Sequence, residues 1–228
     1  MLIKGLQKLT LLDFPGIMAC TVFTGGCNFR CPFCHNASLA LSGGIELDQK
    51  EIFEFLEKRK GLLDGVCISG GEPTLQHDLE DFVKKIKDMG FKVKLDTNGT
   101  NPKAVKSLIE KGLVDYIAMD VKNSPHKYSS TIGNYALNID DILATVNIIK
   151  NSNTPHEFRT TIISEFHTEE DMKLIADIIA GCDGYFIQHY VDRDSCISHG
   201  FTPVDRPTAE KWLNHFNGKA KRTALRGY

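Results

Sequence analysis

Short apolar runs alternate with amphipathic helical segments along most of this chain, and this alternation limits its fold more than any other feature. Six runs are bounded by turn residues and have the length of buried strands: Ile17–Phe23, Val66–Ser69, Val93–Asp96, Tyr116–Asp120, Phe158–Ile163 and Tyr185–Gln188. Helical patterns lie between them, at Asp78–Met89, after the capping residue Asn101, at Ile139–Lys150, and at Glu169–Ile179 behind Thr168. We therefore expect parallel strands joined by right-handed helical crossovers.

The number of strand–helix units narrows the choice of architecture. An eight-unit barrel typically needs about 250 residues, whereas this chain has 228. We expect an incomplete (β/α)6 barrel of the TIM type, and an open doubly wound sheet is the alternative that periodicity does not separate from it. We expect one domain over residues 1–228, with a core of about 15–190 and a short C-terminal extension of about 191–228.

Composition and charge exclude several classes of protein. The formal net charge of −2 lacks the broad basic surface of a nucleic-acid binder. No run approaches the about 20 apolar residues that cross a bilayer, and residues 1–10 lack the apolar core of a signal peptide. We expect a cytoplasmic protein that binds neither nucleic acid nor membrane.

The chain has seven cysteines, which are unevenly distributed. Cys27, Cys31 and Cys34 lie close together directly after the first predicted strand. The others stand alone in the sequence: Cys20, Cys67, Cys182 and Cys196. An odd number in a reducing compartment argues against a disulfide framework. Three thiolates suit an iron–sulfur cluster with one open iron; zinc with His35 as fourth ligand is the alternative, although adjacency to Cys34 strains tetrahedral coordination.

Other unusual residues follow the ends of later predicted strands, where parallel architectures gather their chemistry. These segments are Gly70-Gly71-Glu72-Pro73, Asp96-Thr97-Asn98-Gly99, Asp120-Val121-Lys122, Arg159 and Gln188-His189. The first four also have a structural interpretation. Paired glycines form ordinary turns, Asp96 suits an Asx turn or helix cap, and Asp120 with Lys122 suits a buried ion pair. Arg159 suits either a carboxylate ligand or a solvated strand edge.

The cysteine spacing, with Phe33 before the third cysteine, resembles the C-x3-C-x2-C hallmark of radical S-adenosylmethionine (SAM) enzymes. In that superfamily three cysteines bind a [4Fe-4S] cluster, and the open iron is chelated by SAM. An electron from the cluster cleaves SAM to methionine and a 5′-deoxyadenosyl radical, so the cofactors supply the difficult chemistry. The resemblance implies that Cys27, Cys31 and Cys34 are the catalytic cluster ligands.

The later segments resemble motifs of the activating enzymes of glycyl radical enzymes. In that group the GGEP segment binds the amino group of SAM, and the DTNG and D-x-K segments form a site for a monovalent cation, Na⁺ or K⁺, beside the SAM carboxylate. The implied cation ligands are Asp96, Thr97 and Asp120. The expected SAM contacts are Phe33, Asn36, Gly70, Gly71, Glu72, Lys122, Arg159, Gln188 and His189.

The opening segment Gln7–Gly16 and the closing segment Leu225–Gly227 resemble activating proteins of anaerobic ribonucleoside-triphosphate reductase. That resemblance implies hydrogen abstraction from a glycine of the partner reductase, with flavodoxin or ferredoxin as electron donor. No ferredoxin-like insert lies between Asn36 and Gly65, so we expect one cluster. The basic run Lys219–Arg222 suits either a partner contact or a solvated face.

Two other functions stay open at this point. The first is a radical SAM enzyme that acts on a small molecule, such as a protein similar to 7-carboxy-7-deazaguanine synthase, which shares the core motifs. The second is a non-catalytic iron–sulfur or zinc protein, against which the Gly70–Pro73 and Asp96–Gly99 segments argue.

Overall fold

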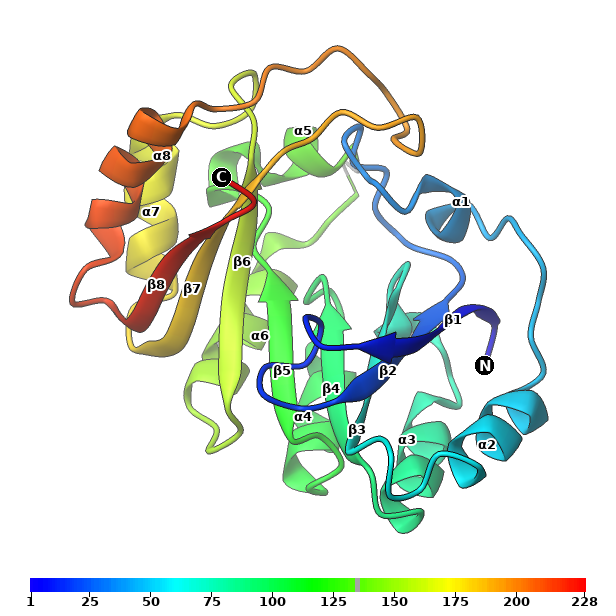
Figure 1. The fold of residues 1–228 in the computed structure, drawn as a ribbon. Helices are drawn as coiled ribbons and strands as arrows, with labels where there is room; N and C mark the ends of the chain where they lie inside the picture. The colour runs from blue at the N-terminus through cyan, green and yellow to red at the C-terminus, as the bar shows by residue number, and fades with distance from the viewer. Residues whose placement is uncertain (134–135) are drawn as a thin grey trace.

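The computed structural model describes residues 1–133 and 136–228, and their strands form one curved sheet in the order β1 to β8 (Figure 1). The first strand, β1 (Ile3–Thr10), is antiparallel to its neighbour β2 (Ala19–Thr24). All later neighbours are parallel. These strands are β3 (Gly65–Gly70), β4 (Lys92–Thr97), β5 (Tyr116–Asp120), β6 (His156–Ile162), β7 (Cys182–His189) and β8 (Ala220–Arg226).

Helices cover the outer face of this sheet (Figure 1). The helices that do so are α2 (Gln49–Glu57), α3 (Leu79–Asp88), α4 (Pro102–Glu110), α6 (Ile139–Lys150), α7 (Glu169–Ile178) and α8 (Arg206–Leu213). The short helices α1 (Ala37–Ala40) and α5 (Tyr128–Ile132) lie instead at the carboxyl ends of the strands. Short 3-10 turns are η1 (Pro73–Leu75), η2 (Pro125–Lys127) and η3 (Asn214–Phe216). No helix of the described residues is long and apolar enough to cross a bilayer.

The six predicted strands correspond to β2 through β7, so the incomplete barrel expected from the sequence is confirmed. Local signals fix several element ends. Asn101 caps α4 by accepting a hydrogen bond from the Ala104 N–H at 3.1 Å. Thr168 begins α7 through a capping box with Asp171. The sheet does not close within the described part of the chain, because no pairing joins β1 to β8.

The edge strands β1 and β8 were not predicted. The β1 register shifts twice, between Ile3 and Gly5 and between Gln7 and Thr10, which obscures the alternation expected of a strand. The basic run that enters β8 lies on the surface, where Lys221 pairs with Asp183 at 2.7 Å. The run is therefore a solvated edge whose charges are partly paired within the chain.

Side chains alternate between the two faces of the strands. On β4, Val93 and Leu95 are fully buried in the main apolar core, whereas Lys94 and Asp96 form an ion pair on the other face. The concave interior is consequently polar, and it leads up to the carboxyl ends of the parallel strands.

Candidate active site

A cavity of about 610 Å³ lies at the carboxyl ends of the parallel strands, which is within the usual size range of small-ligand sites. It collects nearly all residues singled out from the sequence: Cys27, Cys31, Phe33, Cys34, Asn36, Gly70, Gly71, Asp96, Thr97, Asp120, Lys122, Arg159, Gln188 and His189. Segments far apart in the sequence therefore meet at one site, as expected for a parallel barrel.

The three cysteines lie on the loop that follows β2. Cys31 is buried, whereas Cys27 and Cys34 are partly exposed. Burial raises the pKa of Cys31 to about 12 even though Lys122 acts in the opposite sense. The Asn98 side-chain amide points its Nδ2 at Cys27 Sγ, 3.8 Å away. Within the described residues no three His, Cys, Asp or Glu side chains form a ready-made single-ion site.

Two glycines bring the end of β3 against the start of the cysteine loop. Gly70 has φ +121°, a conformation that disfavours other residues, and a Cβ there would lie 2.4 Å from backbone atoms of Thr24. A Cβ on Gly71 would lie 2.0 Å from the carbonyl oxygen of Gly26. Asn36 adds a link by donating from Nδ2 to the Gly70 carbonyl at 3.4 Å. The two glycines thus let the two loops pack backbone against backbone, and both glycines line the cavity.

Glu72 differs from the sequence expectation that it contacts SAM, because its side chain is fully buried and does not line the cavity. Its carboxylate accepts hydrogen bonds from the Asn98 N–H at 2.6 Å and the Thr97 hydroxyl at 2.7 Å. It also accepts from the Thr74 N–H at 3.1 Å and the Thr74 hydroxyl at 2.5 Å. Glu72 therefore fixes the loop after β3 to the turn after β4.

Five side chains of alternating charge form a row across the cavity floor: Lys94, Asp96, Arg159, Asp120 and Lys122. Lys94 pairs with Asp96, and Arg159 reaches Asp96 Oδ2 at 3.5 Å and Asp120 Oδ1 at 2.9 Å. Lys122 Nζ lies 2.9 Å from Asp120 Oδ2. Burial alone would raise the pKa of Asp120, but Arg159 and Lys122 hold that pKa far below its usual range. The structural interpretation of Asp120 and Lys122 as an ion pair is thus also true, and Arg159 has partners within the chain.

At the end of β7, Gln188 and His189 both line the cavity. The Gln188 side-chain oxygen Oε1 accepts from the Thr161 hydroxyl at 3.4 Å. His189 Nδ1 is buried and has no hydrogen-bond partner among the described residues, while the ring packs against Tyr228 with centroids 4.5 Å apart. An orphaned buried nitrogen in a cavity wall fits a polar ligand group such as a hydroxyl.

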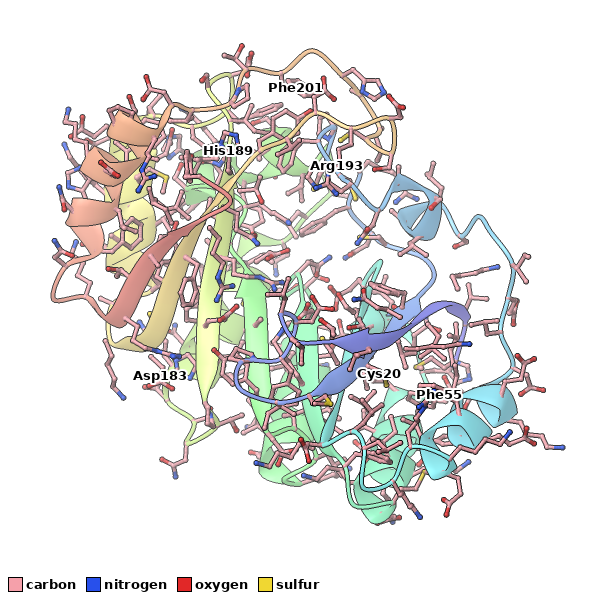
Figure 2. The ribbon with its side chains drawn as sticks, in the orientation of Figure 1. Cys20, Phe55, Asp183, His189, Arg193 and Phe201 are labelled. Atoms are coloured by element: carbon pink, nitrogen blue, oxygen red, sulfur yellow. The ribbon has the colours of Figure 1, made fainter. Side chains whose placement is uncertain are left out.

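The segment after β7 covers the cysteine loop, a relationship that the sequence did not predict. His35 Nε2 donates to the Val191 carbonyl at 2.7 Å, and the Ser198 N–H donates to the Pro32 carbonyl at 2.7 Å. Figure 2 shows His189 at the upper end of β7 and Arg193 further along the same segment, toward the cysteine loop. Arg193 also lines the cavity.

The donor set of the cavity fits an iron–sulfur cluster beside a zwitterionic nucleoside. Thiolates are the usual ligands of iron–sulfur clusters. The glycine backbone that lines the cavity suits an amino group, Lys122 suits a carboxylate, and the buried His189 nitrogen suits a hydroxyl. The residues present therefore match the group that the cysteine motif implies.

Comparison with known proteins agrees with this geometry. The model of the "Radical SAM superfamily" matches residues 21–179. A Methanocaldococcus jannaschii protein named "Putative glycyl-radical enzyme activating enzyme" is 36% identical over 200 residues, which are 85% of this chain and 82% of that protein. The pyruvate formate-lyase-activating enzyme of Clostridium pasteurianum is 30% identical over 185 residues, which are 78% of this chain and 75% of that enzyme.

A solved structure shares the fold. Streptococcus suis SuiB bound to S-adenosylmethionine is similar with a TM-score of 0.71 and 14% identity, over 90% of this chain and 49% of SuiB. The chain spans about half the length of that protein, and the likeness concerns the barrel alone.

Proposed function

The chain belongs to the radical SAM superfamily, whose model covers residues 21–179, and from this premise we propose that it activates a glycyl radical enzyme. The observation that carries the proposal is the cavity in which the cysteine triplet, the Gly70-Gly71 turn and the Asp120–Lys122 strand end meet. These are the motifs that resemble those of activating enzymes. Sequence similarity to two proteins that are named as activating enzymes extends over most of the chain.

Superfamily membership implies a [4Fe-4S] cluster and SAM. We assign the cluster to Cys27, Cys31 and Cys34. When bound, the cluster and SAM together supply the radical chemistry that removes a hydrogen atom from a glycine Cα. We assign SAM to the cavity residues beside the thiols: Phe33, Asn36, Gly70, Gly71, Lys122, Arg159, Gln188 and His189.

The chain's own contribution is to hold these groups still. The Lys122 N–H donates to the Tyr128 hydroxyl at 3.2 Å, and the Lys122 carbonyl accepts from His167 Nε2 at 2.9 Å. Burial lowers the pKa of His167, which favours the neutral ring, and its Nδ1 accepts from the Ile163 N–H at 3.1 Å. Lys122 is therefore fixed through its backbone as well as through Asp120.

Aromatic residues shield the cysteine loop from water. Phe29 and Phe33 on that loop are both buried. Phe33 packs on Phe166 with centroids 5.6 Å apart, and Phe166 packs on Phe201 at 5.4 Å. The covering segment thus joins the loop through apolar contacts, which lower the local dielectric around a charged ligand.

Anaerobic ribonucleoside-triphosphate reductase is the partner that we favour, with flavodoxin or ferredoxin as electron donor. The two segments that resemble its activating proteins lie on opposite edges of the sheet, on and after β1 and at the end of β8. Gln7 and Asp13 of the opening segment line the cavity, and Arg226 of the closing segment pairs bidentately with Glu157 at 2.7 and 2.9 Å. A cytoplasmic location stays a prediction.

The decisive experiment is anaerobic reconstitution with iron and sulfide, reduction with dithionite, and assay of 5′-deoxyadenosine with SAM present. We expect product from the wild type and none above background from Cys31→Ala, with Cys182→Ala as a control for a cysteine outside the cavity. No product from the wild type contradicts the proposal.

Adding the candidate reductase tests the narrower claim. We expect a glycyl radical doublet in its EPR spectrum. If 5′-deoxyadenosine forms and no doublet appears with this reductase, the choice of partner is wrong while the SAM chemistry stands. A small molecule consumed in step with SAM favours the alternative class of radical SAM enzyme.

A further inference from the structure

Lys94 is a buried cation beneath the cavity, and the sequence analysis did not single it out. Its side chain is 1% exposed and forms an ion pair with Asp96, the next residue on the same face of β4. It does not line the cavity itself, whereas Asp96 does. Because a buried ammonium without a partner is costly, Lys94 and Asp96 are held together as a pair.

All four carboxylate oxygens of the predicted cation site already have partners. Asp96 Oδ1 contacts Lys94, while Oδ2 accepts from the Ser69 hydroxyl at 3.1 Å and lies 3.5 Å from Arg159. Asp120 Oδ1 accepts from Arg159 Nε at 2.9 Å, and Oδ2 accepts from Lys122 at 2.9 Å. Each of these oxygens therefore already faces a cationic group.

The third predicted ligand, Thr97, is also engaged. Its hydroxyl donates to Glu72 at 2.7 Å and accepts from the Gly99 N–H at 3.1 Å. A Na⁺ or K⁺ ion needs several free oxygen ligands. The two carboxylates predicted to bind a monovalent cation therefore do not fit one, because three fixed ammonium and guanidinium groups already contact their oxygens and would repel a metal ion placed among them.

The net charge of the row of five side chains indicates what takes the place of a Na⁺ or K⁺ ion. Three cationic groups, on Lys94, Arg159 and Lys122, accompany two carboxylates, on Asp96 and Asp120, so the row carries one net positive charge. A ligand carboxylate that approached Lys122 from the cavity would bring the sum to zero. The chain thus contains the positive charge that a metal cation would otherwise add.

We propose that the Lys94 ammonium takes the place of a monovalent metal cation, so that a ligand carboxylate binds at this row without Na⁺ or K⁺. Applied to the carboxylate of SAM, the inference rests on the proposed function. Lys94 is a positioning residue that acts on the ligand through Asp96 from below the cavity floor.

The test measures SAM affinity of the cluster-loaded protein by anaerobic calorimetry in chloride salts of K⁺, Na⁺ and tetramethylammonium at equal ionic strength. We expect the wild-type Kd to agree within about twofold among the three salts. Lys94→Met is expected to bind about tenfold more weakly in tetramethylammonium and to recover in K⁺ or Na⁺. Lys92→Met, at an exposed position on the same strand, is the matched control and follows the wild type.

A wild-type Kd that rises about tenfold without K⁺ or Na⁺ overturns the inference. So does a folded Lys94→Met variant whose affinity does not respond to these ions. If that variant fails to fold, the wild-type comparison and the ²³Na linewidth decide, since SAM-dependent broadening of the sodium signal by the wild type contradicts the inference. Absence of SAM binding in every salt contradicts the proposed function instead.

Discussion

Gly71 lies so close to the carbonyl of Gly26 that a Cβ in its place would stand 2.0 Å from that oxygen. The Glu72 N–H donates to the same carbonyl at 2.8 Å, and the Gly71 N–H donates to the Thr24 carbonyl at 2.9 Å. The cysteine loop and the loop after β3 are consequently one backbone unit, and a change in either is transmitted to the other.

We predict that Gly71→Ala pushes these loops apart and destabilises the fold by about 1–3 kcal/mol, the usual cost of overpacking. Iron incorporation during reconstitution is expected to fall as well. Gly5→Ala is the matched control, because its Cβ would meet the Phe23 ring at an ordinary 3.4 Å. Urea unfolding and iron analysis measure both effects. Equal stability of Gly71→Ala and the wild type would show that the loops are not tightly coupled.

Glu72→Gln tests whether residue 72 supports the site or touches the ligand. The amide nitrogen of glutamine would face the Asn98 N–H or the Thr74 and Thr97 donors, leaving at least one donor without an acceptor. We expect a loss of about 1–3 kcal/mol in the free energy of unfolding. Glu51→Gln, on the exposed surface of α2, is the control. Unchanged stability with lost SAM affinity would instead favour the direct contact expected from the sequence.

Lys122→Met removes a cation of the row that lines the cavity just after β5. Without it we expect SAM to bind at least about tenfold more weakly, which corresponds to about 1.4 kcal/mol. Lys122→Arg keeps the charge and is expected to lose less. Calorimetry gives the Kd, and circular dichroism checks the fold. An unaltered Kd for Lys122→Met places the carboxylate elsewhere, with Arg193 as the next candidate.

We expect Asp171 to make the free energy of unfolding depend on pH. Burial would raise the pKa of Asp171, but hydrogen bonds from Lys127, Ser124 and Thr168 hold that pKa well below its usual range. Lys127 Nζ and the Ser124 hydroxyl each donate at 2.6 Å. A lowered folded-state pKa stabilises the fold above the unfolded value of about 3.9, and this contribution is lost as pH falls below it.

Asp171→Asn is therefore expected to be about 1–3 kcal/mol less stable than the wild type at neutral pH. The difference is expected to shrink as the pH falls below about 4. Urea unfolding at a series of pH values measures this difference in stability. Asp81→Asn, at an exposed position of α3, is the surface control. A difference that is constant with pH rules out the electrostatic explanation.

Sequence patterns predicted the parts of the molecule that local chemistry determines. The predicted bounds of β5 and α6 coincide with those in the structure, because turn and capping residues flank both segments. The edge strand β1 was missed because two register shifts interrupt its alternation. Position in sequence could not reveal that the side chain of Glu72 turns away from the cavity while its neighbours line it.

The packing of the segment after β7 over the cysteine loop could not be predicted from the sequence either. It depends on contacts such as that between His35 and Val191, which are 156 positions apart. Long separation also hides the charged row that Lys94 joins, because Asp96, its partner on β4, contacts Arg159 on β6. Tertiary pairing of this kind leaves no periodic signal in the chain.

The hydrogen bond from His35 to Val191 forms late during synthesis of the chain. A nascent chain that has emerged only as far as β6 already carries all three thiols of the cysteine loop, but it lacks the segment that covers them. The segment that covers the cysteine loop is therefore the last part of the site to be synthesised. Iron delivered after release meets a folded, shielded loop, whereas iron delivered earlier meets thiols open to oxidation.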